Sequence, residues 1–110
     1  MPASVFDILE AVRSRPAMYV GGSDADRAGQ LRTLEVLLQG YAMAVNQHGL
    51  RDAVADFNRD FGSYLYRRFG WSMSTGPVAA ILDVEADGDA AWERYWHLVD
   101  DFKREVAVAR

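Results

Sequence analysis

Residues 89–106 read DAAWERYWHLVDDFKREV, a stretch in which large apolar side chains recur every three or four positions. This period places them along one face of a helix, and a face of this size is typical of a helix that packs against a protein core. The face carries Trp92, Tyr95, Trp96, Val99, Phe102 and Val106. The preceding residues, Asp87-Gly88-Asp89, supply a turn and a cap, so the sequence predicts a long last helix after that turn.

Helical periodicity also dominates the start of the chain. Ser4 and Asp7 form a reciprocal capping pair for a first helix, which Pro16 ends because a proline pushes the residue before it out of the helical region. Residues 15–22 combine this proline with two glycines and a short apolar run, so we expect a linker of extended chain there. The ring of Tyr19 is expected to insert into the bundle.

A second helix is expected to start at Ser23 and to end at Gly49 in a left-handed cap. Gly29 and Gly40 fall inside it. Each costs about 1 kcal/mol relative to alanine in a helix, so each predicts either close approach of another element or a kink.

The middle of the chain predicts two more helices. One covers about residues 52–69, where large apolar residues lie four apart, and Gly70 ends it. A short one follows, with a Ser/Thr cap and Pro77 in its first turn. The sequence therefore predicts an all-α fold, a compact bundle of about five helices in a single domain over residues 1–110.

The composition excludes several classes of protein. The 110-residue chain has no cysteine, so it forms no disulfide and offers no thiol nucleophile or thiolate zinc site. His48 and His97 have no nucleophile or metal-ligand pattern beside them, so we expect no enzymatic activity, no metal and no cofactor. The net charge of −4 and a pI near 5.0 argue against nucleic-acid binding, and no apolar stretch approaches the ~18 residues of a membrane span. We expect a soluble, cytoplasmic protein.

Charge is distributed unevenly along the chain. Residues 83–105 hold eight acidic and three basic residues, a net charge of −5 that exceeds the charge of the whole chain. A one-sided acidic region attracts basic proteins, whereas the alternative interpretation is an acidic surface that only keeps the protein soluble. On the first interpretation the partner-binding residues are Asp87, Asp89, Glu93, Asp100 and Asp101.

Two residues of the linker also have both a structural and a functional interpretation. Arg15, in front of the proline, and Tyr19 either pack the linker onto the bundle or line a partner-binding groove between the first two helices. Abundant aromatic residues are typical of core anchors, and an exposed one is a natural hot spot of an interface. A homo-oligomer, in which a second copy buries such residues, is a further alternative.

One stretch, ILEAVRSRPAMYVGG at residues 8–22, resembles the opening of the ATPase domain of DNA gyrase B subunits and related topoisomerases. In that family the next helix carries a glutamate that activates water and, four residues on, an asparagine that holds magnesium. The resemblance places Glu35 and Gln39 at these positions. The longer amide of Gln39 and the missing later adenine and lid motifs imply at most a degenerate nucleotide-binding module that uses Arg15, Glu35 and Gln39.

Nearly the whole chain resembles a group of small helical bacterial proteins, some of them encoded near polymorphic toxins as immunity proteins. The matching features are Arg-Pro-x-Met-Tyr-x-Gly at residues 15–21, Gly40-Tyr41, Phe57, Phe61, Gly76 and Asp101-Phe102. The aromatic residue usual after the group's second glycine is Pro77 here. The resemblance implies a non-enzymatic protein-binding module, an immunity-like inhibitor whose acidic last helix covers a basic partner such as a cognate toxin.

Overall fold

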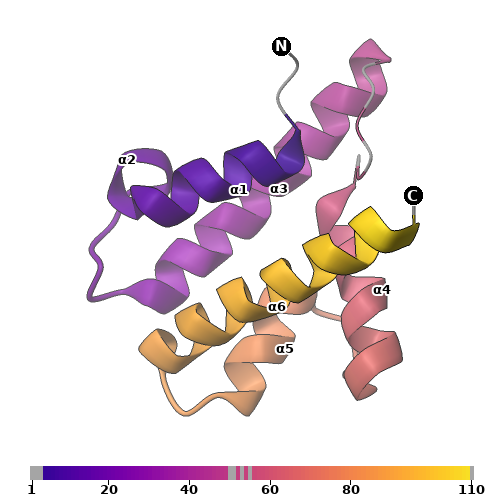
Figure 1. Ribbon diagram of the computed structural model, residues 1–110. Helices are drawn as coiled ribbons and strands as arrows, with labels where there is room; N and C mark the ends of the chain where they lie inside the picture. Colours follow the sequence, from indigo (N-terminus) through magenta and orange to yellow (C-terminus); the bar gives the residue numbers. More distant parts are fainter. Residues whose placement is uncertain (1–3, 50–51, 53, 55, 110) are drawn as a thin grey trace.

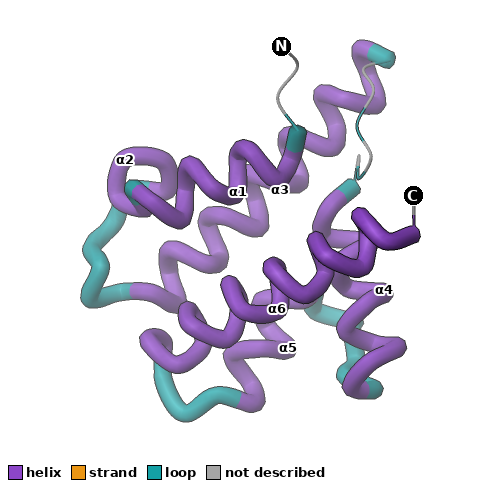
Figure 2. Tube along the Cα trace, in the orientation of Figure 1, coloured by secondary structure: helices purple, strands orange, loops and turns teal. Residues whose placement is uncertain are grey.

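The computed structural model describes residues 4–49, 52, 54 and 56–109, and these form six helices (Figure 1). The helices are α1 (Val5–Ser14), α2 (Pro16–Val20), α3 (Arg27–His48), α4 (Phe57–Phe69), α5 (Pro77–Val84) and α6 (Gly88–Ala109). No strand occurs in this part of the chain (Figure 2). The predicted all-α fold is confirmed, with one helix more than expected.

Helix α6 packs against α3, α4 and α5 (Figure 1). Its predicted apolar face is buried: Trp92, Tyr95, Trp96, Val99 and Phe102 are each less than a tenth exposed. Val106 packs against the same core with part of its surface open. The periodicity of residues 89–106 thus predicted the buried side of the last helix correctly.

Aromatic rings hold α4 against α6. The ring of Phe61 lies 5.0 Å from that of Phe57, 5.6 Å from that of Tyr95 and 5.7 Å from that of Phe102, measured between centroids. Edge-to-face and offset pairs at these distances are favourable beyond the apolar area that they bury. The four-residue spacing in α4 therefore serves the core, as predicted.

The expected extended linker is wrong, since residues 16–20 form α2. Arg15 does leave the helical region, with φ −140° and ψ 69°, as the residue before a proline should. Pro16, however, then occupies the first position of a new helix, where its missing N–H costs no hydrogen bond. The same proline therefore ends α1 and starts α2.

Two helices begin later than predicted. Helix α3 begins at Arg27, because the carboxylate of Asp26 accepts a hydrogen bond from the backbone N–H of Gly29 at 3.0 Å. A Cβ on Gly29 would lie 2.3 Å from that carboxylate, so this glycine makes room for the cap of its own helix and not for another element as predicted. Helix α4 begins at Phe57 with Asp56 as its cap. The predicted helix over 52–56 is not formed by the described residues, and 53 and 55 lie outside them.

The helix ends are as predicted at two glycines. Gly49 ends α3 with φ 63° and Gly70 ends α4 with φ 73°, both in the left-handed region that glycine adopts without strain. His48 is exposed in the last turn of α3 and His97 is exposed on α6.

Asp52 joins α1, α3 and the start of the α4 segment. Its carboxylate accepts hydrogen bonds from the backbone N–H of Val5 at 2.9 Å, from that of Val54 at 3.0 Å and from the hydroxyl of Tyr41. These bonds fix Asp52 ahead of α4, whose own cap is Asp56.

Burial and the hydrogen bond to Asp52 raise the pKa of Tyr41 to about 12 from the ordinary 10.0. Between these values the unfolded chain releases the phenolic proton whereas the folded chain keeps it, so the free energy of unfolding should fall as the pH rises from 10 to 12. Tyr41→Phe removes this group and should make the fall less steep, and the remaining slope reflects Tyr95, whose pKa burial also raises. Urea unfolding of both proteins from pH 9 to 12 checks this, and parallel profiles would contradict it.

Candidate protein-binding groove

Three of the predicted partner-binding acids lie where α6 begins. The carboxylate of Asp87 accepts a hydrogen bond from the backbone N–H of Ala90 at 2.8 Å, so it caps the helix. Asp89 and Glu93 are exposed one turn apart and form no ion pair with another described residue. These two carboxylates are open to a partner.

Asp100 and Asp101 instead contact arginines of this chain. Both oxygens of Asp100 accept hydrogen bonds from Arg13 of α1, at 3.0 and 3.1 Å. Asp101 faces α4, where Arg68 lies 3.6 Å away, and it also pairs with Arg104 on its own helix. The five acids therefore do not share one surface, because adjacent positions on a helix point about 100° apart.

The start of α6 lies beside the start of α3 (Figure 1), since a Cβ on Gly88 would lie 3.2 Å from the backbone nitrogen of Ala28. This contact brings acidic residues from two distant parts of the sequence to the same end of the molecule. We call them the acidic end: Asp24, Asp26, Asp87, Asp89 and Glu93.

Arg15, the residue before α2, and Tyr19, the fourth residue of α2, are both exposed. The predicted insertion of the Tyr19 ring is wrong, because 49% of the residue is exposed. A helix of five residues can turn only one side to its neighbours, and in α2 Val20 is the residue that is buried. The structure therefore leaves Tyr19 at the surface, outside the core.

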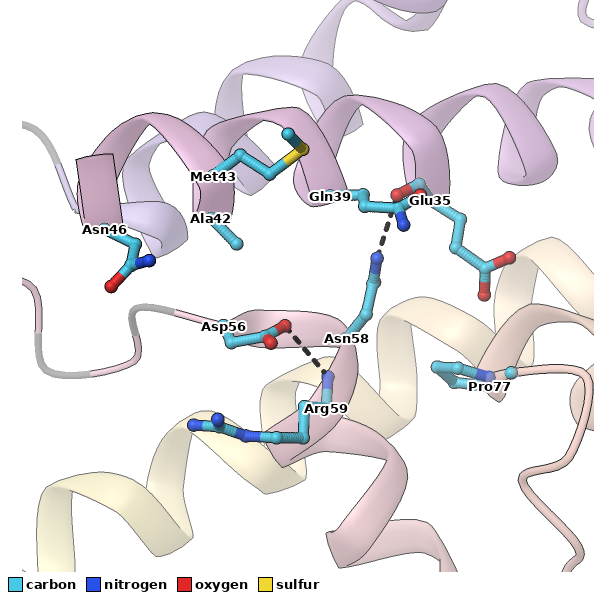
Figure 3. A pocket seen from close by; sticks show the side chains of 10 residues that line it. Glu35, Gln39, Ala42, Met43, Asn46, Asp56, Asn58, Arg59 and Pro77 are labelled. Atoms are coloured by element: carbon cyan, nitrogen blue, oxygen red, sulfur yellow. Dashed lines mark hydrogen bonds between the residues drawn. The ribbon is translucent and has the colours of Figure 1, made fainter.

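A groove forms between α3, α4 and the first residues of α5 (Figure 3). Its deeper part, the polar chamber, has a volume of about 680 Å³. One face of α3, the start of α4 and the Gly76-Pro77 turn provide the lining, which is Glu35, Gln39, Ala42, Met43, Asn46, Asp56, Asn58, Arg59, Gly76 and Pro77.

Each of the two carboxylates of the polar chamber accepts a hydrogen bond from a backbone N–H at the start of a helix. Glu35 accepts a hydrogen bond from the backbone N–H of Val78 at 3.2 Å, which replaces the Ser/Thr cap predicted for α5. Asp56 accepts one from the backbone N–H of Arg59, and the amide of Asn58 donates to the backbone oxygen of Glu35 at 2.8 Å (Figure 3). Both carboxylates thus have structural partners.

An apolar chamber of about 660 Å³ continues the groove along α4. The two chambers share Asn58, Arg59, Gly76 and Pro77. The residues that line only this chamber are Gly62, Ser63, Tyr66, Arg67 and Met73. The aromatic residue Tyr66 is 62% exposed. Gly62 lets Met73 lie close, since a Cβ there would meet its sulfur at 3.4 Å.

The charge of the groove is mixed. The polar chamber carries Glu35, Asp56 and Arg59, a net charge of −1. The guanidinium of Arg59 lies 3.2 Å from the carboxylate of Asp60, an exposed pair that contributes little to stability. Arg59 can therefore move without much cost when a ligand enters.

The described part of the chain contains no cluster of metal ligands, whereas two of the residues expected in a nucleotide site lie together. No group of three His, Cys, Asp or Glu residues there could hold a metal ion. Glu35 and Gln39, which the gyrase-like resemblance singled out, both line the polar chamber, but no strand of the family's sheet is present in these residues.

Sequence reasoning missed the groove, because α3, α4 and the start of α5 lie in different segments whose packing it did not predict. One signal was available: Gly62 and Tyr66 are four apart in a helix and off the Phe57–Phe61 face. A glycine and a tyrosine on the outer side of an amphipathic helix are typical of a contact surface.

Fold and site together define a small all-α protein with a two-chambered surface groove. No described helix is both long and apolar enough to span a membrane. No family model matches the chain, and no curated protein or solved structure matches it.

Proposed function

We propose that this chain is a non-enzymatic protein-binding module, and that the groove holds a segment of a partner protein in which a basic residue follows or precedes a large apolar one. One observation carries the proposal: a polar chamber of net charge −1 opens directly into an apolar chamber. A basic side chain suits the first chamber and an apolar side chain suits the second.

The side chains of the groove favour binding over chemistry. Gln39 and Asn46 can donate to and accept from the backbone of an extended segment, and Tyr66 offers a large rigid surface of the kind enriched at interface hot spots. Glu35 and Asp56 are engaged in holding helix starts, so a role in acid or base catalysis would compete with the fold.

The acidic end supports a basic partner. Asp89 and Glu93 are exposed there, and their field would raise the association rate of a positively charged protein. An immunity-like inhibitor of a basic toxin is one form of this function, with the groove as the contact and the acidic end as a source of attraction.

A display library of random peptides, screened against the purified chain, tests the proposal. We expect enriched peptides to carry Lys or Arg within a few residues of a large apolar side chain. Tyr66→Ala should weaken the best peptide about 10-fold or more, as loss of a hot-spot aromatic does, whereas Tyr19→Ala, an exposed tyrosine on α2, should leave binding unchanged. Fluorescence anisotropy measures both.

Arg59→Glu separates this proposal from an anion-binding groove. It makes the polar chamber more negative, so a basic peptide should bind more tightly and an acidic one more weakly. Absence of basic-apolar peptides from the enriched set, or equal binding by Tyr66→Ala, would overturn the proposal.

A further inference from the structure

The outer side of α3 carries no charge over four turns. Between Thr33 and Gln47 the only charged residue is Glu35, and its carboxylate points into the groove (Figure 3). The exposed residues of this side are Thr33, Val36, Leu37, Gly40, Met43, Ala44 and Gln47, which we call the neutral face.

Large apolar side chains stand open on the neutral face. Val36 is 67% exposed and Met43 66% exposed. Exposed sides of the other long helices carry charges instead, such as Arg67 on α4 and Glu93 on α6. Depletion of charge together with exposed methionine is typical of the core of an interface.

Gly40 occupies the middle of the neutral face. Glycine is unfavourable inside a helix, and the described chain does not require it: no described atom lies within 4 Å of the position that a Cβ would take. The sequence predicted either close approach of another element or a kink at this glycine. No element of the described chain approaches it, so on the first interpretation the approaching backbone would belong to another molecule.

We infer that the neutral face pairs with the neutral face of a second copy of this chain, with two α3 helices crossing in antiparallel orientation at Gly40. Thr33 and Gln47 lie seven residues to either side of Gly40, so an antiparallel pair centred there aligns the two faces over their full length. The bare glycines allow the backbones to approach most closely at the crossing.

Charge favours a second copy over a different partner. Each chain has a net charge of −4, so two copies repel one another through most of their surface. A two-fold contact places like residues near like residues, and only a face without charge avoids adding to this repulsion. A basic partner, in contrast, would find nothing to attract it on the neutral face.

The length of the neutral face limits the area that two copies can bury and so the affinity of the dimer. Fifteen residues of helix extend over about 22 Å, and one helix pair of that length buries less than a standard interface of about 1,600 Å². We therefore expect a reversible dimer with a dissociation constant in the micromolar range. This inference goes beyond the proposed function, because it needs no other protein and uses a different side of α3, which shares only Met43 with the lining of the polar chamber.

Sedimentation equilibrium from about 1 μM to 1 mM chain tests the pairing. The mass should rise from 12.3 kDa toward twice that value. Val36→Glu places two like charges in the contact and should raise the dissociation constant about 10-fold or more, whereas Val108→Glu, at an 87% exposed valine of α6, should not change it.

Gly40→Ala distinguishes loss of pairing from loss of folding. Alanine favours the helix, so the melting temperature of the dilute monomer should rise while the dimer weakens. A mass of 12.3 kDa at every concentration, or an unchanged dimer in Val36→Glu, would overturn the inference. Tyr66→Ala should weaken peptides and spare the dimer, so failure of one proposal can be told from failure of the other.

Discussion

We expect Phe61→Ala to lower the free energy of unfolding by about 3–5 kcal/mol, as deletion of a fully buried aromatic ring does. Phe61 has no solvent-exposed surface and its ring lies between Phe57, Tyr95 and Phe102. The deletion removes apolar contacts with both α4 and α6 and leaves a cavity between them. For a domain whose total stability is about 5–15 kcal/mol, such a loss leaves little folded margin.

Urea unfolding followed by circular dichroism measures this loss. Tyr66→Ala provides a matched control on the same helix, because that ring is mostly exposed and its removal should change stability by less than about 0.5 kcal/mol. Phe61→Leu should fall between the two. Equal stability of the two alanine variants would contradict the assignment of the aromatic cluster as the core.

Gly76→Ala is expected to cost about 2–3 kcal/mol, chiefly through the backbone. Gly76 has φ 93° and ψ 168°, a region that is essentially restricted to glycine. A Cβ would also lie 2.9 Å from the carboxylate of Glu35, which accepts the N–H of Val78 at the start of α5. The carboxylate would have to move and the helix start would lose its acceptor.

A double-mutant cycle with Glu35→Ala separates these two causes. If displacement of the carboxylate contributes, Gly76→Ala should cost less in the Glu35→Ala background than in the wild type. Gly40→Ala is the control, since this glycine is helical and open, and it should stabilise the chain by up to about 1 kcal/mol. A cost for Gly76→Ala below about 0.5 kcal/mol would contradict the assigned strain.

The parts of the fold that sequence predicted correctly depend on local signals. The buried side of α6 follows from spacing alone, and Gly49 and Gly70 end their helices because a left-handed cap needs no distant contact. Pro16 shows the limit: the same residue is compatible with the end of one helix and the start of the next. Nothing within the linker decided between an extended chain and α2.

Helix starts were predicted less well because several residues near each start could cap it. Ser23, Asp24 and Asp26 all lie before α3, and only the structure shows that Asp26 holds the N–H of Gly29. Asp52 is a good cap by type, but its carboxylate accepts hydrogen bonds from Val5 and Tyr41, and the cap of α4 is Asp56. Contacts between remote segments thus position Asp52, whereas the choice at α3 is local.

The same limit applies to the site. Counting acids along residues 83–105 could not reveal that Arg13 of α1 and Arg68 of α4 reach Asp100 and Asp101. It also could not bring Asp24 and Asp26 to the start of α6. The sequence shows that Glu35 is the only charged residue between Thr33 and Gln47. The meaning of this pattern depended on which side of α3 faces the core.

The contact of Gly88 with Ala28 brings the first turns of α3 and α6 together, and with them two positive helix ends of about half an elementary charge each. Side by side, these ends repel unless anions are close. The carboxylates of Asp26 and Asp87 lie at these two ends, where each accepts a backbone N–H. These two carboxylates therefore offset the positive ends of the two helices. The electrostatic potential that another protein meets at this end is weaker than the number of acids there implies.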